Sequence, residues 1–140
     1  MGGSRTYKPR HLRQPTKSFQ PRAINLERDR DQKLHKTAEW THFRSKFLNE
    51  NPECYCCGEV SKVVDHIEPS KGRLDVFERT GNHIALCTRH HNTITGKFDA
   101  RFCVGGDLAP KLNWIAHERV RNEVMSDRKF KPVRVVRYKK

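Results

Sequence analysis

The sequence predicts a small α+β fold, in which a metal-stapled core of helices and two short strands carries flanking helices and basic terminal arms. Three observations predict it. Apolar residues recur at helical spacing in two segments, short runs rich in valine and isoleucine lie between them, and two Cys/His pairs share the same spacing. With 140 residues, 34% of them hydrophobic, the chain fits one domain with a small apolar core.

The first predicted helix begins after Thr37, a residue type that caps helix N-termini. Its apolar residues recur at helical spacing: Trp40, Phe43, Phe47 and Leu48. Asn51 and Pro52 end it, because proline cannot continue a helix. We therefore expect a helix of about three turns directly before the first cysteines.

Two short strands and a second helix are expected next. Val60, Val63 and Val64 mark the first strand, residues 84–86 mark the second, and an irregular loop joins them. A short helix follows from Arg89 and ends near residue 96.

The net charge of +13 is concentrated at the two ends of the chain. Residues 1–40 contain ten Lys/Arg and four Asp/Glu, and residues 126–140 contain seven and one, so each end carries +6. Basic arms of this kind neutralise phosphates and release counterions, which favours nucleic acid as the partner over tails that only aid solubility. We expect a basic N-terminal arm (1–36), a core (37–100), a helical extension (101–125) and a basic C-terminal segment (126–140).

The C-terminal part is expected to contribute one helix and one strand. The helix runs from about residue 111 to 125, and one of its faces is apolar: Leu112, Ile115, Ala116, Val120 and Val124. Trp114 then completes the core, and Arg119 and Arg121 lie on a side that faces solvent or DNA. The strand is a run of apolar residues among basic ones: Val133, Val135, Val136 and Tyr138.

No stretch approaches the roughly 18 apolar residues of a membrane span, and the first ten residues lack the apolar segment of a secretory signal. We therefore expect an intracellular, cytoplasmic protein with no membrane partner. In a reducing compartment, the five cysteines indicate metal ligation rather than disulfides.

Two Cys/His pairs predict a structural zinc site. Cys54 and Cys57 form a C-x2-C pair followed by Gly58, a turn in which both thiolates face one ion, and Cys87 and His90 repeat the spacing. A Cys3His set is a tetrahedral ligand set for Zn²⁺. A small core gains little from apolar burial alone, so we expect structural zinc to decide whether the domain folds.

A second group of polar residues lies between and beside these pairs. Asp65 and His66 end the first strand, Asn82 precedes the second, and His91 follows His90. Hydrolysis of a phosphodiester needs a base that activates water, a cation that offsets charge on the phosphate, and a group that orients the base. Asp65, His66, Asn82 and His91 can supply all three.

Three residues near these sites have expectations of their own. Cys56 lies beside Cys57 and can replace it as a ligand with a changed turn, so both choices stay open. Cys103 has no partner at the same spacing, and we expect it to be a small core residue. His83, beside Asn82, is expected to be an exposed histidine at a strand edge rather than a phosphate or metal contact.

In this region the sequence resembles the HNH endonucleases, particularly the small bacterial and phage type with paired zinc knuckles. The resemblance spans residues 40–95 and is specific as an ordered set. The matching residues are Trp40, Phe47-Leu48, Asn51-Pro52, Cys54-x2-Cys57-Gly58, Val64-Asp65-His66-Ile67-x-Pro69, Asn82, Leu86-Cys87-x2-His90-His91 and Thr95.

The resemblance implies a ββα-metal fold and a catalytic set of His66, Asn82, Asp65 and His91. In it, His66 is the general base, Asp65 and His91 hold a catalytic Mg²⁺ or Mn²⁺ ion, and Asn82 holds the His66 loop by hydrogen bonding. The family usually has a fourth cysteine where this chain has His90. The adjacent histidines therefore leave open which of them serves which metal.

The predicted function is metal-dependent cleavage of DNA, by nicking or double-strand cleavage, with the basic arms supplying affinity. The resemblance also implies a phage setting in the host cell, with other phage DNA-processing proteins as partners. One alternative is a non-catalytic zinc module that binds nucleic acid through its arms, which leaves Asn82 and His91 without a role. Another is a structural component of a ribonucleoprotein, which predicts tight RNA binding without cleavage.

Overall fold

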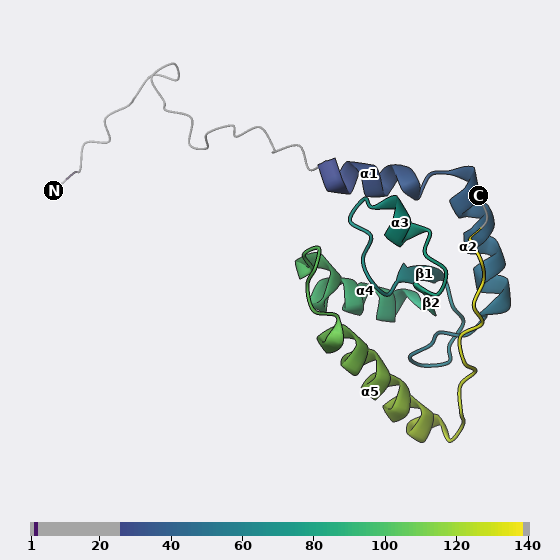
Figure 1. Ribbon diagram of the computed structural model, residues 1–140. Coiled ribbons are helices and arrows are strands. Elements are labelled where there is room, and N and C mark those ends of the chain that lie inside the picture. Colours follow the sequence, from purple (N-terminus) through teal and green to yellow (C-terminus); the bar gives the residue numbers. More distant parts are fainter. Residues whose placement is uncertain (1, 3–25, 139–140) are drawn as a thin grey trace, which may run out of the picture.

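The computed structural model describes residue 2 and residues 26–138. In chain order the elements are α1 (Leu26–Leu34), α2 (Ala38–Glu50), β1 (Val63–His66), α3 (Leu74–Phe77), β2 (His83–Leu86), α4 (Thr88–Lys97), the 3-10 helix η2 (Asp99–Arg101) and α5 (Ala109–Ser126). The small α+β fold expected from the sequence is confirmed, with β1 and β2 at the centre and helices around them (Figure 1).

Helix α2 has the ends that its sequence predicts. The Thr37 side chain accepts a hydrogen bond from the amide of Trp40, which satisfies one of the free donors of the first turn. At the other end the Asn51 amide donates to the Phe47 carbonyl, and Pro52 follows. Trp40, Phe43 and Phe47 are the buried residues of the helix, so the predicted apolar face is the face that packs.

The two strands form an antiparallel pair whose register sorts the side chains onto two faces. Val64 lies opposite Ala85, Asp65 opposite Ile84, and His66 opposite His83. Successive residues of a strand point to opposite faces. Asp65 therefore shares a face with Ile84, whereas His66 shares the other face with Val64.

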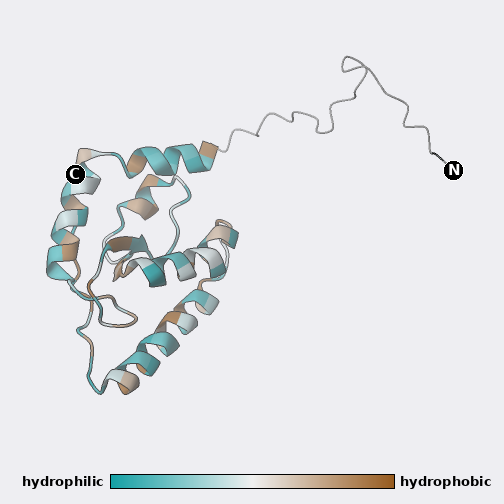
Figure 2. Ribbon diagram, turned by 180° about the vertical axis from the view of Figure 1, so that it is seen from behind, coloured by the Kyte–Doolittle hydropathy of each residue, from teal (hydrophilic) through white to brown (hydrophobic). Residues whose placement is uncertain are grey.

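Each face of the sheet has its own apolar cluster. The cluster on the Val64 face contains Trp40, Phe43, Phe47, Phe77, Ala85 and Val136, and the cluster on the Ile84 face contains Cys54, Cys56, Leu86, Cys87, Ile94 and Ile115. Figure 2 shows the hydrophobic strands at the centre, with mainly hydrophilic residues along α1. Helix α2 thus covers one face, and α4 with α5 covers the other.

The C-terminal segment does not form the expected strand. After α5 it runs as an extended chain back along α2 (Figure 1). The Asn51 side chain accepts from the Arg134 amide at 2.7 Å and donates to the Arg134 carbonyl at 2.9 Å. Val136 is buried, and the Tyr138 ring packs on Phe43. One side-chain amide therefore takes the backbone bonds that a strand partner would have taken, and this basic segment is part of the core.

The expected arm over residues 1–36 ends in a helix. Helix α1 has no buried residue, but the Asp31 carboxylate accepts hydrogen bonds from the Ser70 hydroxyl and, at 3.2 Å, from the Gly72 amide. These bonds attach α1 to the loop after β1. The rest of the expected arm, at residues 1 and 3–25, lies outside the described residues, as do residues 139–140.

Helix α5 packs differently from its predicted apolar face. Ile115 is buried as expected, and Trp114 packs against the cluster on the Ile84 face. The other four members of the predicted face are exposed: Leu112, Ala116, Val120 and Val124. Arg119 turns inward, where it donates to the carbonyls of Tyr55, Phe130 and Lys131. The expected solvent-facing role of Arg119 is therefore wrong, because the C-terminal segment covers that side of α5. None of the helices over residues 26–138 is long and apolar enough to cross a membrane.

Candidate metal centre and active-site cleft

Four side chains from two separate turns meet at one point. Cys54 and Cys57 come from the turn after α2, whereas Cys87 and His90 come from the start of α4. Their ligand atoms all lie within 4.8 Å of one another. In this turn Gly58 has a φ of +73°, and a Cβ there would collide with the Phe130 ring, so the glycine after the pair is required.

Two of the three distances between ligand atoms fit a tetrahedral zinc site, and the third is shorter. Cys57 Sγ and Cys87 Sγ are 3.8 Å apart, and His90 Nδ1 is 3.2 Å from Cys87 Sγ and 3.8 Å from Cys54 Sγ. Ligands bonded to zinc at about 2.3 Å for sulfur and about 2.1 Å for nitrogen are separated by about 3.6–3.8 Å in a tetrahedron. The Cys3His cluster therefore has the donor set and the spacing to hold Zn²⁺.

The structure separates the two adjacent cysteines of the turn. Cys57 belongs to the cluster and Cys56 does not. The Cys56 side chain is fully buried beside Cys54, whose pKa is lowered to about 4, chiefly by a hydrogen bond from the Cys56 thiol. The same hydrogen bond and burial raise the pKa of Cys56, which keeps it a protonated donor. Cys103 is exposed, which corrects the expectation of a core residue.

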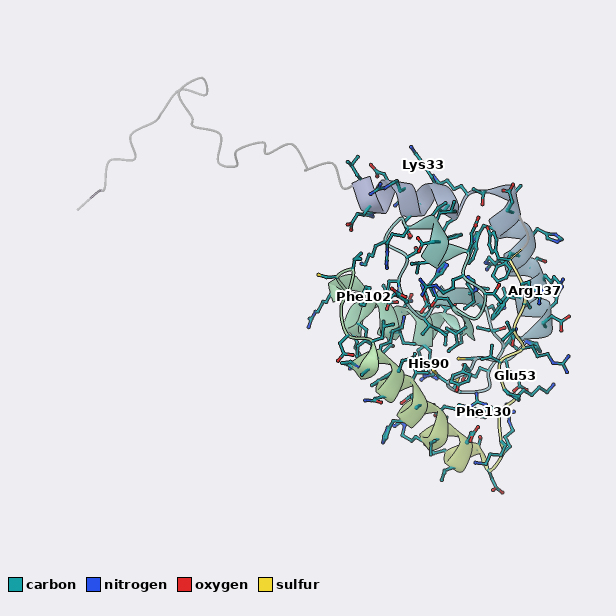
Figure 3. All side chains as sticks on the ribbon, viewed as in Figure 1. Lys33, Glu53, His90, Phe102, Phe130 and Arg137 are labelled. Atoms are coloured by element: carbon teal, nitrogen blue, oxygen red, sulfur yellow. The ribbon has the colours of Figure 1, made fainter. Side chains whose placement is uncertain are left out.

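A carboxylate supports the cluster from α5. His90 Nε2 lies 3.2 Å from Oε1 of Glu118, while Nδ1 of the same ring faces the sulfur atoms. Figure 3 shows His90 between α4 and α5. A histidine that binds a metal commonly donates its other N–H to a carboxylate, which fixes its tautomer and raises its basicity. Glu118 was not singled out in the sequence, because 28 residues separate it from His90.

The adjacent histidines of α4 contact different groups: His90 faces the sulfur atoms and His91 faces Asp65. Consecutive helix residues point about 100° apart, so His91 turns away from the sulfur atoms and toward β1. His91 Nε2 lies 3.8 Å from Oδ1 of Asp65. Two atoms that bind one Mg²⁺ or Mn²⁺ ion at about 2.1 Å are about 3–4 Å apart. Asp65 and His91 could therefore hold the same ion.

The Asp65 carboxylate is short of partners in its buried position. It is 8% exposed, and Oδ2 has no hydrogen-bond partner among the described residues. Burial raises the pKa of Asp65 to about 6, although Lys111 opposes the shift. A buried carboxylate favours a bound cation, because a cation offsets the cost of removing the charge from water.

A cleft of about 410 Å³ runs along β1. All four residues of β1 line it, although they alternate between the two faces of the sheet. The cleft must therefore follow the free edge of the strand. Its other lining residues come from α1, α2, the loop after β1, α4 and η2: Asp31, His35, Trp40, Arg44, Pro69, Ser70, Lys71, His91, Thr95, Asp99 and Ala100.

The His66 ring is held in one orientation at this cleft. It stacks on Trp40 with 5.4 Å between ring centroids, and its Nε2 lies 3.0 Å from the Phe77 carbonyl. A carbonyl only accepts hydrogen bonds, so Nε2 carries the proton and Nδ1 is left as a proton acceptor. Burial and the neighbouring His83 lower the pKa of His66 to about 3. The ring is therefore neutral at neutral pH, as a general base must be.

His83 is not the exposed residue that was expected. Its side chain is 2% exposed, and its Nε2 also lies 3.0 Å from the Phe77 carbonyl. Burial lowers the pKa of His83 to about 4. The expectation failed because β2 pairs directly with β1, and α2 covers the face on which His83 lies.

Asn82 closes the loop that follows His66. Its Oδ1 accepts from the Glu68 amide at 2.8 Å, and its Nδ2 donates to the carbonyls of Glu68 and Val76 at 3.0 and 3.1 Å. The Ile67 amide donates to the Asn82 carbonyl. The buried Asn82 side chain thus connects the start of the loop, just after His66, to α3.

Other polar residues in or beside this cleft were not found from the sequence. Lys111 of α5 and Asp99 of η2 form a buried ion pair beside Asp65, at 2.8 Å from Nζ to Oδ1. His35, just after α1, has its ring centroid 5.9 Å from that of His66. Lysine and aspartate are common surface residues, and no local pattern distinguishes this pair; only contacts distant in sequence reveal it.

The fold and these two sites define a small α+β protein that carries a Cys3His cluster beside a cleft lined with acidic and histidine side chains. No family model matches the chain. No curated protein matches it.

Among solved structures, the chain is similar to the crystal structure of the HNH endonuclease of the deep-sea thermophilic bacteriophage GVE2 with manganese ion. The two chains are 27% identical, the match covers 55% of this chain and 94% of that chain, and the TM-score is 0.42. This is the family that the motifs between Trp40 and Thr95 resemble.

Proposed function

We propose that this protein is a metal-dependent DNA endonuclease of the HNH type, with Zn²⁺ in the Cys3His cluster and Mg²⁺ or Mn²⁺ at Asp65 and His91. One observation carries the proposal: a single strand delivers Asp65 and His66 to the same cleft, where Asp65 faces His91 at 3.8 Å and His66 keeps Nδ1 as a proton acceptor. A zinc module without catalysis needs none of this arrangement.

The chemistry follows from the residues of the cleft. Nδ1 of His66 takes a proton from a water molecule, the water oxygen bonds to phosphorus, and the bond from phosphorus to the leaving oxygen breaks. The Phe77 carbonyl stabilises the charged ring that results, because it accepts a hydrogen bond from Nε2–H. A divalent ion, when bound, offsets negative charge on the phosphate and on the leaving oxygen. Asn82 keeps the loop behind His66 in place.

The basic segments supply affinity in this proposal. Residues 1–25 contain six Lys/Arg and no Asp/Glu, and such a segment binds phosphates without reading sequence. The neutral base and the two proposed metal ligands, Asp65 and His91, lie in the cleft, so DNA binding and chemistry use different parts of the chain.

Nicking of supercoiled plasmid tests the proposal. Zinc-loaded protein should nick with added Mn²⁺ or Mg²⁺ and stop when a chelator removes that ion while zinc remains bound. His91→Ala should keep DNA affinity and lose metal-dependent nicking. His117→Ala, which changes an exposed histidine on α5 outside the cleft, should behave like the parent. A folded, zinc-loaded parent that binds DNA without nicking would contradict the proposal and favour the non-catalytic zinc module.

A further inference from the structure

Lys111 is a lysine in an unusual environment. It lies in the first turn of α5 and is 2% exposed. Its Nζ donates to the His66 carbonyl at 2.8 Å, and lies 2.8 Å from Oδ1 of Asp99 and 3.6 Å from Oδ2 of Asp65. The contact with the His66 carbonyl is a hydrogen bond, and the two carboxylates are ion-pair partners of the ammonium group.

Neither the burial of this position nor its place in α5 favours a lysine. Burial of an ammonium group is costly unless it is paired and hydrogen-bonded. The first turn of a helix is also where the helix dipole disfavours a positive charge. The next residue, Leu112, is 45% exposed, so the helix buries a charge and exposes an apolar side chain. Such a violation of local rules is expected where function requires it.

The contacts of Lys111 join the proposed metal ligand to the proposed base. Oδ1 of Asp65 faces His91, and Oδ2 of the same carboxylate faces Lys111. The carbonyl that Lys111 binds belongs to His66 itself. Asp99 offsets the charge of the ammonium group at 2.8 Å. Since Lys111 is buried, it acts on these residues and does not reach a DNA phosphate.

We propose that Lys111 is a positioning residue, which holds Asp65 Oδ2 and the His66 main chain. Asp65 Oδ1 is then placed to bind the metal ion, and the His66 ring is placed to take a proton from the attacking water. This inference rests on the proposed nuclease function and deepens it. Misplacement of a reacting group by about 1 Å can cost about a hundredfold in rate, so the contribution of Lys111 is expected in turnover and not in DNA binding.

The test is Lys111→Met, which keeps most of the side-chain volume and removes the charge. At saturating Mn²⁺, kcat for plasmid nicking should fall at least about tenfold, while KM for DNA stays within about threefold of the parent. The electron paramagnetic resonance spectrum of Mn²⁺ bound to the zinc-loaded protein, without DNA, should also change, because the Asp65 ligand is no longer held. A merely structural lysine would move neither readout in folded protein.

Controls separate the outcomes. Lys46→Met removes an exposed lysine of α2 that lies outside the cleft and outside both basic segments, and it should leave kcat and the Mn²⁺ spectrum unchanged. If Lys111→Met does not fold, Asp99→Asn/Lys111→Met removes the stranded carboxylate charge as well, and its kcat should be at least about tenfold below that of Asp99→Asn alone. Unchanged kcat, an effect on KM alone, or an unchanged Mn²⁺ spectrum overturns the inference. A folded parent that nicks no DNA overturns the proposed function itself.

Discussion

His66 and His83 direct their Nε2 atoms at the same acceptor, the main-chain oxygen of Phe77, each from 3.0 Å. The two residues are register partners on β1 and β2 and lie on the same face of the sheet. Both are buried, but only His66 lines the cleft. They form a matched pair: the same residue type and the same hydrogen bond, with different access to a substrate.

The first prediction uses this pair to test the base. His66→Gln should reduce kcat at least about a hundredfold, since a general base contributes about 10²–10⁴ in rate. His83→Gln should lower the melting temperature and keep kcat near the parent value in the folded fraction. Kinetics on protein of verified zinc content measures both. Equal losses of kcat in the two variants would show that activity depends on the hydrogen bonds to the Phe77 carbonyl and not on His66 as a base.

The second prediction concerns acid. The pKa of His83 is lowered to about 4 by burial, whereas an unfolded histidine titrates near 6.5. The unfolded chain therefore binds more protons between these values, and folded stability falls as pH drops from about 6.5 toward 4. At pH 5, protonation of His83 in the unfolded chain should lower the free energy of unfolding by about 2 kcal/mol.

This effect of His83 is measured by comparing the parent with His83→Gln. The zinc cluster titrates in both proteins, so its effect cancels in the difference. His83 also lowers the pKa of His66, so the difference reports His83 together with its effect on His66. The gap in unfolding free energy between the parent and the variant, measured with denaturant, should narrow by about 2 kcal/mol from pH 7 to pH 5. A gap that does not change with pH would show that His83 is not held neutral in the folded state.

The third prediction concerns the Cys3His cluster. Cys87→Ser should lose bound zinc and cooperative folding, because the binding energy of a structural zinc site is folding energy. Cys103→Ser is the control: this cysteine is exposed, so zinc content and melting temperature should match the parent. Metal analysis and thermal melting report the result. A Cys87→Ser protein that melts at the parent temperature would rule out a structural role for the metal.

The fourth prediction concerns the support of His90. Glu118→Gln removes the charged partner that lies 3.2 Å from His90 Nε2, and loss of such a partner typically costs 10–100-fold in metal affinity. Competition with a chelator should therefore show zinc binding at least about tenfold weaker. Glu123→Gln, on the same helix but paired with Arg119 and Lys129, should keep the parent affinity. Identical affinities in the two variants would exclude a role for Glu118 in zinc binding.

The fifth prediction concerns the N-terminal boundary. Removal of residues 1–25 should weaken DNA binding and flatten its salt dependence by about 0.9 in log–log slope for each phosphate that the arm neutralises, while nicking survives at low salt. Removal of residues 1–36 also deletes α1 with Asp31 and His35, which reach Ser70 and His66. Nicking should then stay impaired at any enzyme concentration. Nicking by both truncated proteins at equal rates would show that α1 is dispensable for the cleft.

Local patterns in the sequence were sufficient for much of the core. Helix α2, the two strands and α4 lie close to their predicted positions, because helical periodicity, caps and short β-branched runs act over a few residues. Val60 is the exception, since it lies outside β1 and is exposed. The spacing of the two Cys/His pairs likewise predicts the Cys3His cluster. Asp65 and His66 end β1 as expected, and the alternation of side chains in that strand sends one toward α4 and the other toward α2.

Only the tertiary structure decided what lies around these residues. Lys111 reaches His66 across 45 positions of the chain, and Glu118 reaches His90 across 28. Tertiary contacts also bury His83 and leave Cys103 exposed. They place the C-terminal segment along α2, where Asn51 binds it in place of a strand partner. The physical reason is the same in each case. A short sequence window records the preference of a residue for a helix, a strand or a turn, whereas burial of a charge or an imidazole depends on partners that the rest of the chain brings to it.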